Sequence, residues 1–224
     1  MNTPQRILVI NPNSTEAVTR GLDAAMECHR AGGNVTIDCV TLKEGPPGIE
    51  NQQHADGVIA PLMNLLRERE GQYDAFVIAC YSDPGLHSLR ELTKKPVLGI
   101  AECGLLTAMT LGQRIGVIAI LQKSIPRHLR YVAAMGIGDR LAAELPLEMG
   151  VVELSQEERT MARLIEVGRA LREQHGADVV VLGCAGMAAY RGRLQQAIGV
   201  PVVDPSQAAA GMAIAHVALG WHLA

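Results

Sequence analysis

The sequence predicts an α/β protein made of two similar units, each with a parallel sheet. Short apolar segments alternate with longer segments that have the spacing of amphipathic helices, as in β-α-β units with right-handed crossovers. The same series of segments occurs twice along the chain. The 224 residues suffice for two domains of roughly 100–110 residues each. Hydrophobic residues make up 48% of the chain, which provides for a sizeable core.

Eight segments have the composition of strands that are buried on both faces of a parallel sheet. Each is short, rich in Val, Ile and Leu, and bounded by turn or helix signals. The predicted strands are 6–11, 34–40, 74–80, 96–100, 114–120, 150–154, 178–184 and 200–204. The segments between them are predicted to be helices, which gives the alternation on which the fold class depends.

Helix starts are predicted from capping residues and from the spacing of apolar side chains. Ser14 is the predicted cap of the first helix, and segment 58–70 places its apolar residues on one helical face. Segment 156–175 repeats that spacing, with Ser155 as its predicted N-cap and two glutamates in its first turn. The apolar segment 208–224 is too short to span a bilayer comfortably, so we predict a buried helix.

An internal repeat indicates two related domains. The repeated features, about 105 residues apart, are an Arg-Ile-x-Val-Ile strand, an Asp-(five residues)-Cys strand and a Pro-Val pair. They occur at 6–10 and 114–118, at 74–80 and 178–184, and at 96–97 and 201–202. Any two parallel strands look alike, but here the order of the features is repeated as well. We predict a first domain of residues 1–98 plus 207–224 and a second domain of residues 99–206, although the last helix could pack on either.

Two cysteines stand at equivalent strand ends in this repeat. Cys80 and Cys184 each follow a predicted strand, and ligands of open parallel sheets bind at the carboxyl ends of strands. If the two domains face each other, both thiols enter one cleft from opposite sides. A thiolate on one face can then remove a proton from a carbon acid, while a thiol on the other face returns one and inverts the centre. The pair predicts a racemase, whose two bases should be of nearly equal competence.

The remaining cysteines have a plainer interpretation. A single cysteine is more often a small buried hydrophobe than a functional group. Cys28, Cys39 and Cys103 have no matched partner in the repeat, so we interpret them as structural. No cysteine and histidine cluster has the spacing of zinc ligands, and we predict no metal site.

Five motifs resemble those of the aspartate/glutamate/hydantoin racemase superfamily, and most closely its hydantoin and allantoin racemase branch. They are 11–15 (NPNST), 45–50 (GPPGIE), 79–86 (ACYSDPGL), 90–91 (RE) and 182–187 (LGCAGM). The resemblance extends over nearly the whole chain. It implies two pseudo-symmetric flavodoxin-like domains, each with a four-stranded parallel sheet flanked by helices, and an active site in the cleft between them. It also implies a cofactor-independent mechanism with Cys80 and Cys184 as the acid/base pair, and a homo-oligomer.

The same resemblance implies a set of substrate-binding residues. These are Asn11, Ile49, Tyr81, Ser82, Asp83, Ala185 and Gly186. From the residues alone, Asp83 could equally have a capping role in an Asp-Pro turn, and Asn11 could be only the turn residue before Pro12. Amino-acid racemases of the superfamily carry Asn-Thr after the first cysteine and Thr-His after the second, where this chain has Tyr-Ser and Ala-Gly. That difference favours a hydantoin-type cyclic ureide, hydantoin or allantoin, over aspartate or glutamate. The alternatives are an amino-acid racemase and a non-catalytic small-molecule binder. Arylmalonate decarboxylases keep only the second cysteine, so Cys80 argues against that activity.

Composition excludes several other classes of function. The chain has 20 Lys and Arg against 23 Asp and Glu, without a basic run, and only 3% aromatic residues, which disfavours a nucleic-acid partner. Segment 136–141 lacks the third glycine of a dinucleotide loop, and no Walker motif occurs, so we predict no cofactor. The N-terminal residues do not have the pattern of a signal peptide, which predicts a cytoplasmic protein without a membrane partner.

Overall fold

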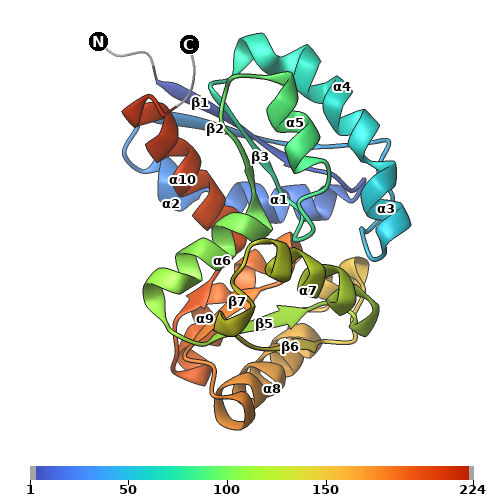
Figure 1. Ribbon diagram of the computed structural model, residues 1–224, viewed down its shortest axis with the longest axis vertical. Coiled ribbons are helices and arrows are strands. Elements are labelled where there is room, and N and C mark those ends of the chain that lie inside the picture. The colour runs from blue at the N-terminus through green and yellow to red at the C-terminus, as the bar shows by residue number, and fades with distance from the viewer. Residues whose placement is uncertain (1–3, 222–224) are drawn as a thin grey trace.

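The computed structural model describes residues 4–221 and contains two parallel sheets of four strands each, flanked by helices. Figure 1 shows one sheet in the upper half of the molecule and the other in the lower half. The predicted fold class is confirmed. Among residues 4–221, no helix has both the length and the apolar character needed to cross a membrane.

The first sheet is formed by the N-terminal half of the chain. Its strands are β1 (Gln5–Asn11), β2 (Val35–Thr41), β3 (Ala75–Ile78) and β4 (Val97–Gly99), in the order β2-β1-β3-β4. The connecting helices are α1 (Glu16–Ala25), α2 (Glu27–Arg30), α3 (Gln52–Gly57), α4 (Ile59–Arg69), the 3-10 turn η1 (Glu70–Gln72) and α5 (Leu86–Leu92). Strands β1 and β3 lie in the middle of the sheet, and β3 is buried throughout, as its run of apolar residues predicts.

The second sheet repeats this arrangement. Its strands are β5 (Ile115–Ala119), β6 (Leu141–Pro146), β7 (Val179–Leu182) and β8 (Val202–Val203), in the order β6-β5-β7-β8. The helices are α6 (Ile100–Leu111), α7 (Ile125–Ala134), α8 (Glu157–His175), α9 (Arg191–Ile198) and α10 (Pro205–Leu219). Short 3-10 segments are η2 (Gln122–Ser124), η3 (Gly138–Arg140), η4 (Val151–Ser155) and η5 (Ala185–Tyr190).

One predicted strand is wrong. Residues 150–154 do not pair with the sheet, and instead belong to the 3-10 segment η4. Val151 and Leu154 are buried whereas Val152 is 60% exposed, so the apolar residues are used three apart, as in a helical turn. The edge strand is β6, which pairs with β5 and carries two alanines and a glutamate. Because that composition lacks β-branched residues, it does not predict a strand.

Two predicted helix caps are also wrong. The N-cap of α1 is Thr15 rather than Ser14, and its side chain makes no capping hydrogen bond. The N-cap of α8 is Gln156, while the Ser155 hydroxyl donates to the carbonyl of Val152 at 2.9 Å. The Ser155 hydroxyl is used within η4, and at α1 the backbone N–H of Ser14 donates to the Pro46 carbonyl. Each helix starts one residue later than the capping residue predicts. The predicted helix 58–70 corresponds closely to α4.

The last helix packs against the first sheet and joins the two halves. Helix α10 contacts β1, β3 and β4 and lies along α6, which itself contacts strands of both sheets (Figure 1). A Cβ on Gly104 of α6 would lie 2.8 Å from the Pro205 Cβ, so this close approach requires glycine. We propose that α10 belongs to the first domain, together with residues 1–98. Residues 222–224 of that predicted domain lie outside the described part of the chain.

Candidate active site

The loops after β3 and β7 bring two cysteines into one pocket. Cys80 follows Ile78 by two residues and Cys184 follows Leu182 by two residues. The residue before each cysteine donates its N–H to the neighbouring central strand, Ala79 to the Ile10 carbonyl and Gly183 to the Ile118 carbonyl, at 2.8 Å in both halves. The repeat therefore places the two thiols equivalently. Both line a pocket whose cavity volume is about 30 Å³.

Each thiol is influenced by an N–H group two residues further along the chain. The N–H of Gly186 donates to the Cys184 Sγ at 3.4 Å, and the N–H of Ser82 lowers the pKa of the Cys80 thiol. Burial raises the pKa of Cys80 to about 11 and that of Cys184 to about 12, and these N–H groups oppose the rise. A negative charge on Cys80 raises the pKa of Cys184 further, so the two thiols titrate as an interacting pair.

Arg127 reaches this pocket from the second half of the molecule. It lies on α7, and its Nε donates to the Ser82 Oγ at 2.9 Å. Burial lowers the pKa of Arg127, although a guanidinium remains charged at any pH that the protein meets. Among the described residues that line the pocket, Arg127 is the one Lys or Arg side chain. It therefore adds a positive charge beside the loop of Cys80.

A buried histidine and glutamate pair forms the wall behind Arg127. The Nδ1 of His128 lies 2.5 Å from the Oε1 of Glu144, and both side chains are almost fully buried. The His128 ring meets the ring of Tyr81 edge to face, with centroids 5.1 Å apart. Within residues 4–221, the Tyr81 hydroxyl and the Oε2 of Glu144 have no hydrogen-bond partner. The pair fixes the imidazole, which lines the pocket, in one orientation.

The structure brings together six of the nine predicted site residues. Those that line the pocket are Cys80, Cys184, Ile49, Tyr81, Ser82 and Ala185. Gly186 lies behind Cys184 and lines an adjoining groove. Asn11 is fully buried under the pocket, where its Nδ2 donates to the Asn13 Oδ1 at 3.2 Å and to the Thr19 Oγ1 at 3.0 Å. It holds the loop after β1 in place, and Asn13 is the residue of that loop that lines the pocket.

Asp83 does not line this pocket, and its contacts are those of the capping role that was the alternative to substrate binding. Its carboxylate accepts the N–H groups of Ala101 and Glu102 and the hydroxyl of Tyr131, each at 2.9 Å. It is thus the cap of α6, held in a left-handed conformation with φ of 42°. A Cβ on Gly99 would lie 2.2 Å from the Asp83 carboxyl carbon, so the glycine makes room for this cap. Burial raises the pKa of Asp83 to about 7, although its three donors favour the charged form.

Several pocket residues were not predicted. They are Asn13, Val18, Ala79, Ile120, Ser124, Arg127, His128, Val151 and Gly183. Three of them lie in segment 122–128, which follows β5 as the motif 11–15 follows β1. The repeat therefore held a signal for them, because residues after equivalent strands meet at the same edge of the fold. No comparable signal relates His128 to Glu144.

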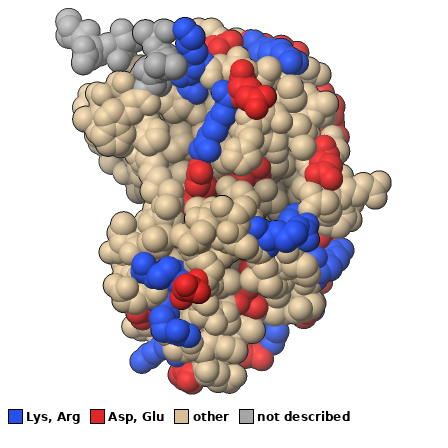
Figure 2. Space-filling view, viewed as in Figure 1, with Lys and Arg blue, Asp and Glu red and all other residues tan. Residues whose placement is uncertain are grey.

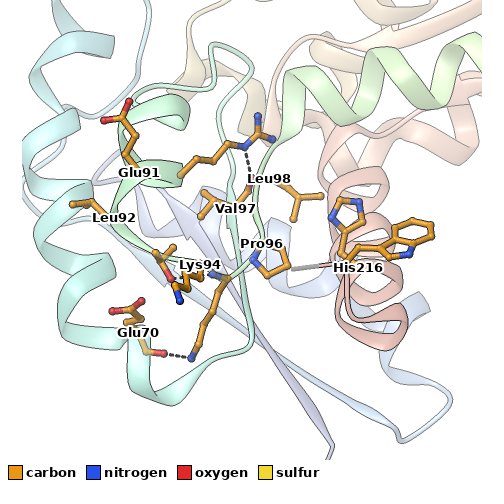
Figure 3. A pocket seen from close by; sticks show the side chains of 12 residues that line it. Glu70, Glu91, Leu92, Lys94, Pro96, Val97, Leu98 and His216 are labelled. Carbon is orange, nitrogen blue, oxygen red and sulfur yellow. Dashed lines mark hydrogen bonds between the residues drawn. The ribbon is translucent and has the colours of Figure 1, made fainter. Parts of the chain in front are cut away.

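A larger hollow lies elsewhere on the surface and has different chemistry. Its cavity volume is about 820 Å³, and Figure 3 shows Pro96, Val97 and Leu98 on one side of it and His216 of α10 on the other. Cations at this hollow bond to the chain: the Nε of Arg90 donates to the Val97 carbonyl, and the Nζ of Lys95 to the Tyr73 carbonyl. Cysteine is absent among the described residues that line it.

Charged side chains of both signs are mixed over the face that Figure 2 shows. In the part of the chain that the structure describes, no three His, Cys, Asp or Glu side chains gather as a metal site. The reactive groups of the candidate site are the two thiols, with the polar groups of the pocket around them.

Comparisons with known proteins agree with this arrangement. Residues 7–213 match the family described as Asp/Glu/Hydantoin racemase. Hydantoin racemase of Paenarthrobacter aurescens is 36% identical over 220 residues, which cover 96% of this chain and 92% of that protein. Allantoin racemase from Klebsiella pneumoniae superposes with a TM-score of 0.88 at 33% identity, covering 96% of this chain and 89% of that one. Allantoin racemase from Pseudomonas fluorescens superposes at 0.92 and 29% identity, covering 96% and 92%. The chain belongs to the Asp/Glu/hydantoin racemase family.

Proposed function

We propose that the protein racemises a hydantoin-type cyclic ureide without a cofactor, with Cys80 and Cys184 as the acid/base pair. The observation that carries this proposal is the placement of two thiols at equivalent strand ends in one pocket. Each thiol has its own backbone N–H donor, so either sulfur can hold a negative charge. A pocket that only bound a ligand would not need a second thiol in the matched position.

The reaction follows from this arrangement. The thiolate of one cysteine takes the proton from C5 of the ring, and the electron pair of the C–H bond moves onto the C4 carbonyl as an enolate. The thiol of the other cysteine then gives its proton to the opposite face of C5. The product is the other enantiomer, and the two sulfurs have exchanged charge. Polar side chains of Asn13, Ser124 and Arg127 line the pocket and can donate to the enolate oxygen.

The charges around the pocket favour a neutral ring over an amino acid. An α-amino acid carries an ammonium group, which needs a carboxylate partner when it leaves water. Among the described residues that line the pocket, none is Asp or Glu, and the Asp83 carboxylate is turned to the start of α6. The N–H and C=O groups of a ureide can instead bond to neutral groups such as Asn13 and Ser124.

An adjoining groove fits a hydrocarbon substituent on C5. It has a cavity volume of about 240 Å³ and shares Val18, Val151 and Ala185 with the cysteine pocket. The space between the thiols is too small for a large substituent, so the rest of the substrate extends beyond it. Alanines, valines and a leucine dominate the lining of the groove. We therefore infer an apolar 5-substituent rather than the polar ureido group of allantoin.

Proton NMR in D₂O tests this function. Enantiopure 5-isobutylhydantoin, allantoin, aspartate and glutamate are incubated with the protein, with spontaneous exchange subtracted by means of the Cys80→Ser/Cys184→Ser double variant. We expect deuterium at C5 of the hydantoin together with loss of its optical rotation, and slower exchange of allantoin. Exchange of an amino acid alone would replace the ureide by the second candidate, whose carboxylate Arg127 could bind. Absence of exchange from every compound would leave the small-molecule binder.

A further inference from the structure

The two ends of the cysteine pocket differ in chemistry although they come from a repeated fold. Helix α1 of the first half lies against η5, the segment after Cys184, and presents Val18 to the pocket. Helix α7 of the second half occupies the equivalent place after β5 and presents Arg127 to the loop of Cys80. Each cysteine is thus approached by a helix of the opposite half. One helix supplies a hydrocarbon side chain and the other supplies a cation.

A chain of hydrogen bonds connects this cation to one thiol. The Nε of Arg127 donates to the Ser82 Oγ at 2.9 Å, which leaves the proton of that hydroxyl free to be donated. The hydroxyl and the backbone N–H of Ser82 both act on the Cys80 thiol and lower its pKa. A hydroxyl that accepts a bond from a cation becomes a stronger donor, because successive hydrogen bonds polarise one another.

Cys184 lacks the equivalent connection. Position 186, which matches Ser82 in the repeat, is glycine, so only its backbone N–H can bond to the Cys184 Sγ. Carboxylates act on both thiols: Asp204 and Glu50, after the charge of Cys80 itself, raise the pKa of Cys184, and Asp83 raises that of Cys80. The difference is Arg127, a cation whose charge lowers the pKa of Cys80 and outweighs the effect of Asp83 there. Glu50 is itself paired with Lys123 at 3.1 Å. The groups on each side therefore favour a thiolate at Cys80 and a thiol at Cys184.

We propose that Arg127 is a positioning residue that acts through Ser82 to make Cys80 the more acidic of the two thiols, so that the form with a thiolate at Cys80 outnumbers the form with a thiolate at Cys184. The distribution of charge does not depend on a substrate, whereas its catalytic consequence rests on the proposed function. In a racemase the form with its thiolate at Cys80 accepts the enantiomer whose C5–H faces Cys80. The other enantiomer binds to the form with a thiol at Cys80 and a thiolate at Cys184. This form is the scarcer of the two.

Unequal acidity of the two thiols should make KM and kcat differ between the two enantiomers. Because the equilibrium constant of racemisation is one, kcat/KM must be equal for the two enantiomers at every pH. Unequal populations of the two charge forms therefore appear as different KM values, each balanced by a matching difference in kcat. The enantiomer that binds to the scarcer form has the higher KM. The loss of Arg127 should bring the two KM values together.

Alkylation of the thiols tests the proposal without a substrate. The native protein is treated with iodoacetamide in short pulses from pH 6 to pH 12.5, circular dichroism checks that it stays folded during each pulse, and peptides that contain Cys80 and Cys184 are quantified by mass spectrometry. The pH midpoint of each rate is used, since the midpoint does not depend on how accessible a thiol is. We expect the midpoint of Cys80 to lie below that of Cys184, and each pH unit between them corresponds to a tenfold difference in thiolate population.

Three variants separate the relay from general effects. Arg127→Gln and Ser82→Ala should each raise the midpoint of Cys80 and should not raise that of Cys184, whereas Arg127→Lys should restore part of the Cys80 shift. Arg130→Gln is the matched control, because Arg130 lies on the same helix, is exposed and bonds to Gln52 instead. Thermal melts confirm that each variant is folded, and Ser82→Ala provides the test if Arg127→Gln does not fold.

Each outcome of this experiment decides the proposal. Equal midpoints in the wild-type protein, a lower midpoint for Cys184, or an unchanged Cys80 midpoint in both Arg127→Gln and Ser82→Ala would overturn it. A shifted midpoint in a protein that exchanges no hydantoin proton would support the relay and contradict the proposed function. Racemisation of the hydantoin by a protein whose Cys80 midpoint does not shift in the variants would support the proposed function and contradict the relay.

Discussion

Replacing Gly183 by alanine should displace Cys184 while leaving its thiol chemically unchanged. Gly183 comes directly before Cys184, where its N–H bonds to the Ile118 carbonyl of β5. A Cβ at position 183 would lie 2.5 Å from that carbonyl oxygen and 3.3 Å from the Cα of Ala119. Both are backbone atoms of a strand that is buried in the middle of its sheet. The strain must therefore be relieved by movement of the β7 end.

The size of this movement sets the expected loss of activity. Lengthening the 2.5 Å contact to an ordinary one requires a shift of roughly 0.5 to 0.9 Å at position 183. Because a misplacement of about 1 Å can lower a rate about 100-fold, we expect kcat/KM to fall between about 10-fold and 100-fold. The overpacking should also destabilise the protein by about 1–3 kcal/mol, and each kcal/mol lowers the Tm of a chain of this size by about 2–4 °C.

The assay follows the optical rotation of a 5-substituted hydantoin, with a thermal melt of the same sample. Gly192→Ala is the matched control, because a Cβ there meets nothing within 4 Å and the residue lies in α9, where alanine favours the helix. The control should keep its activity and its Tm. Wild-type kcat/KM in a folded Gly183→Ala protein would refute the argument that this strand end sets the position of the thiol.

Three further predictions use the same assays. Cys80→Ser and Cys184→Ser should each lower racemisation by about 10²–10⁴-fold while the remaining thiol exchanges the C5 proton of one enantiomer in D₂O, and Cys28→Ser should have little effect. Gly99→Ala should displace the Asp83 cap of α6 and lower the free energy of unfolding in urea by about 1–2 kcal/mol, whereas Gly57→Ala, whose Cβ would meet nothing, should not. Since burial raises the pKa of Cys80 to about 11 and the base is the thiolate, kcat/KM should rise about tenfold per pH unit from pH 6 to pH 8; a plateau below pH 8 would contradict this.

The central strands could be predicted from sequence because burial on both faces leaves a continuous apolar run. Segments 6–11 and 178–184 show this, and the repeat between the halves located the two cysteines at equivalent ends. The edge strand β6 could not be predicted in the same way, because it is half-buried and its residues have no strong β preference. Val151 and Val152 predict a strand where the structure has η4. Composition does not distinguish two valines in a helical turn from two valines in a sheet.

The roles of Arg127 and of the His128–Glu144 pair could not be predicted from the sequence for another reason. Arg127 acts on a loop 45 residues away in the chain, and His128 pairs with a glutamate 16 residues away. Neither contact has a local pattern: the first depends on how α7 lies relative to the first sheet, and the second on how α7 packs against β6 of the second sheet. Asp83 shows that local position alone does not decide between a pocket role and a capping role. It follows Cys80 closely, but its carboxylate accepts the free N–H groups at the start of α6.

Equal competence of the two bases, expected from the repeat, is not a requirement of racemisation. The equilibrium constant fixes kcat/KM to be the same in both directions whether the thiols are matched or not. A difference of one pKa unit between them costs about 1.4 kcal/mol in the free energy of the less populated charge form. This free energy raises the KM of the enantiomer that binds to the less populated form. The kcat of that enantiomer is higher by the same factor. A duplicated fold therefore needs to preserve the positions of Cys80 and Cys184, while Arg127 and Val18 are free to differ. Selection on one physiological enantiomer would act on that difference, and the KM values of the two enantiomers would reveal which one it favours.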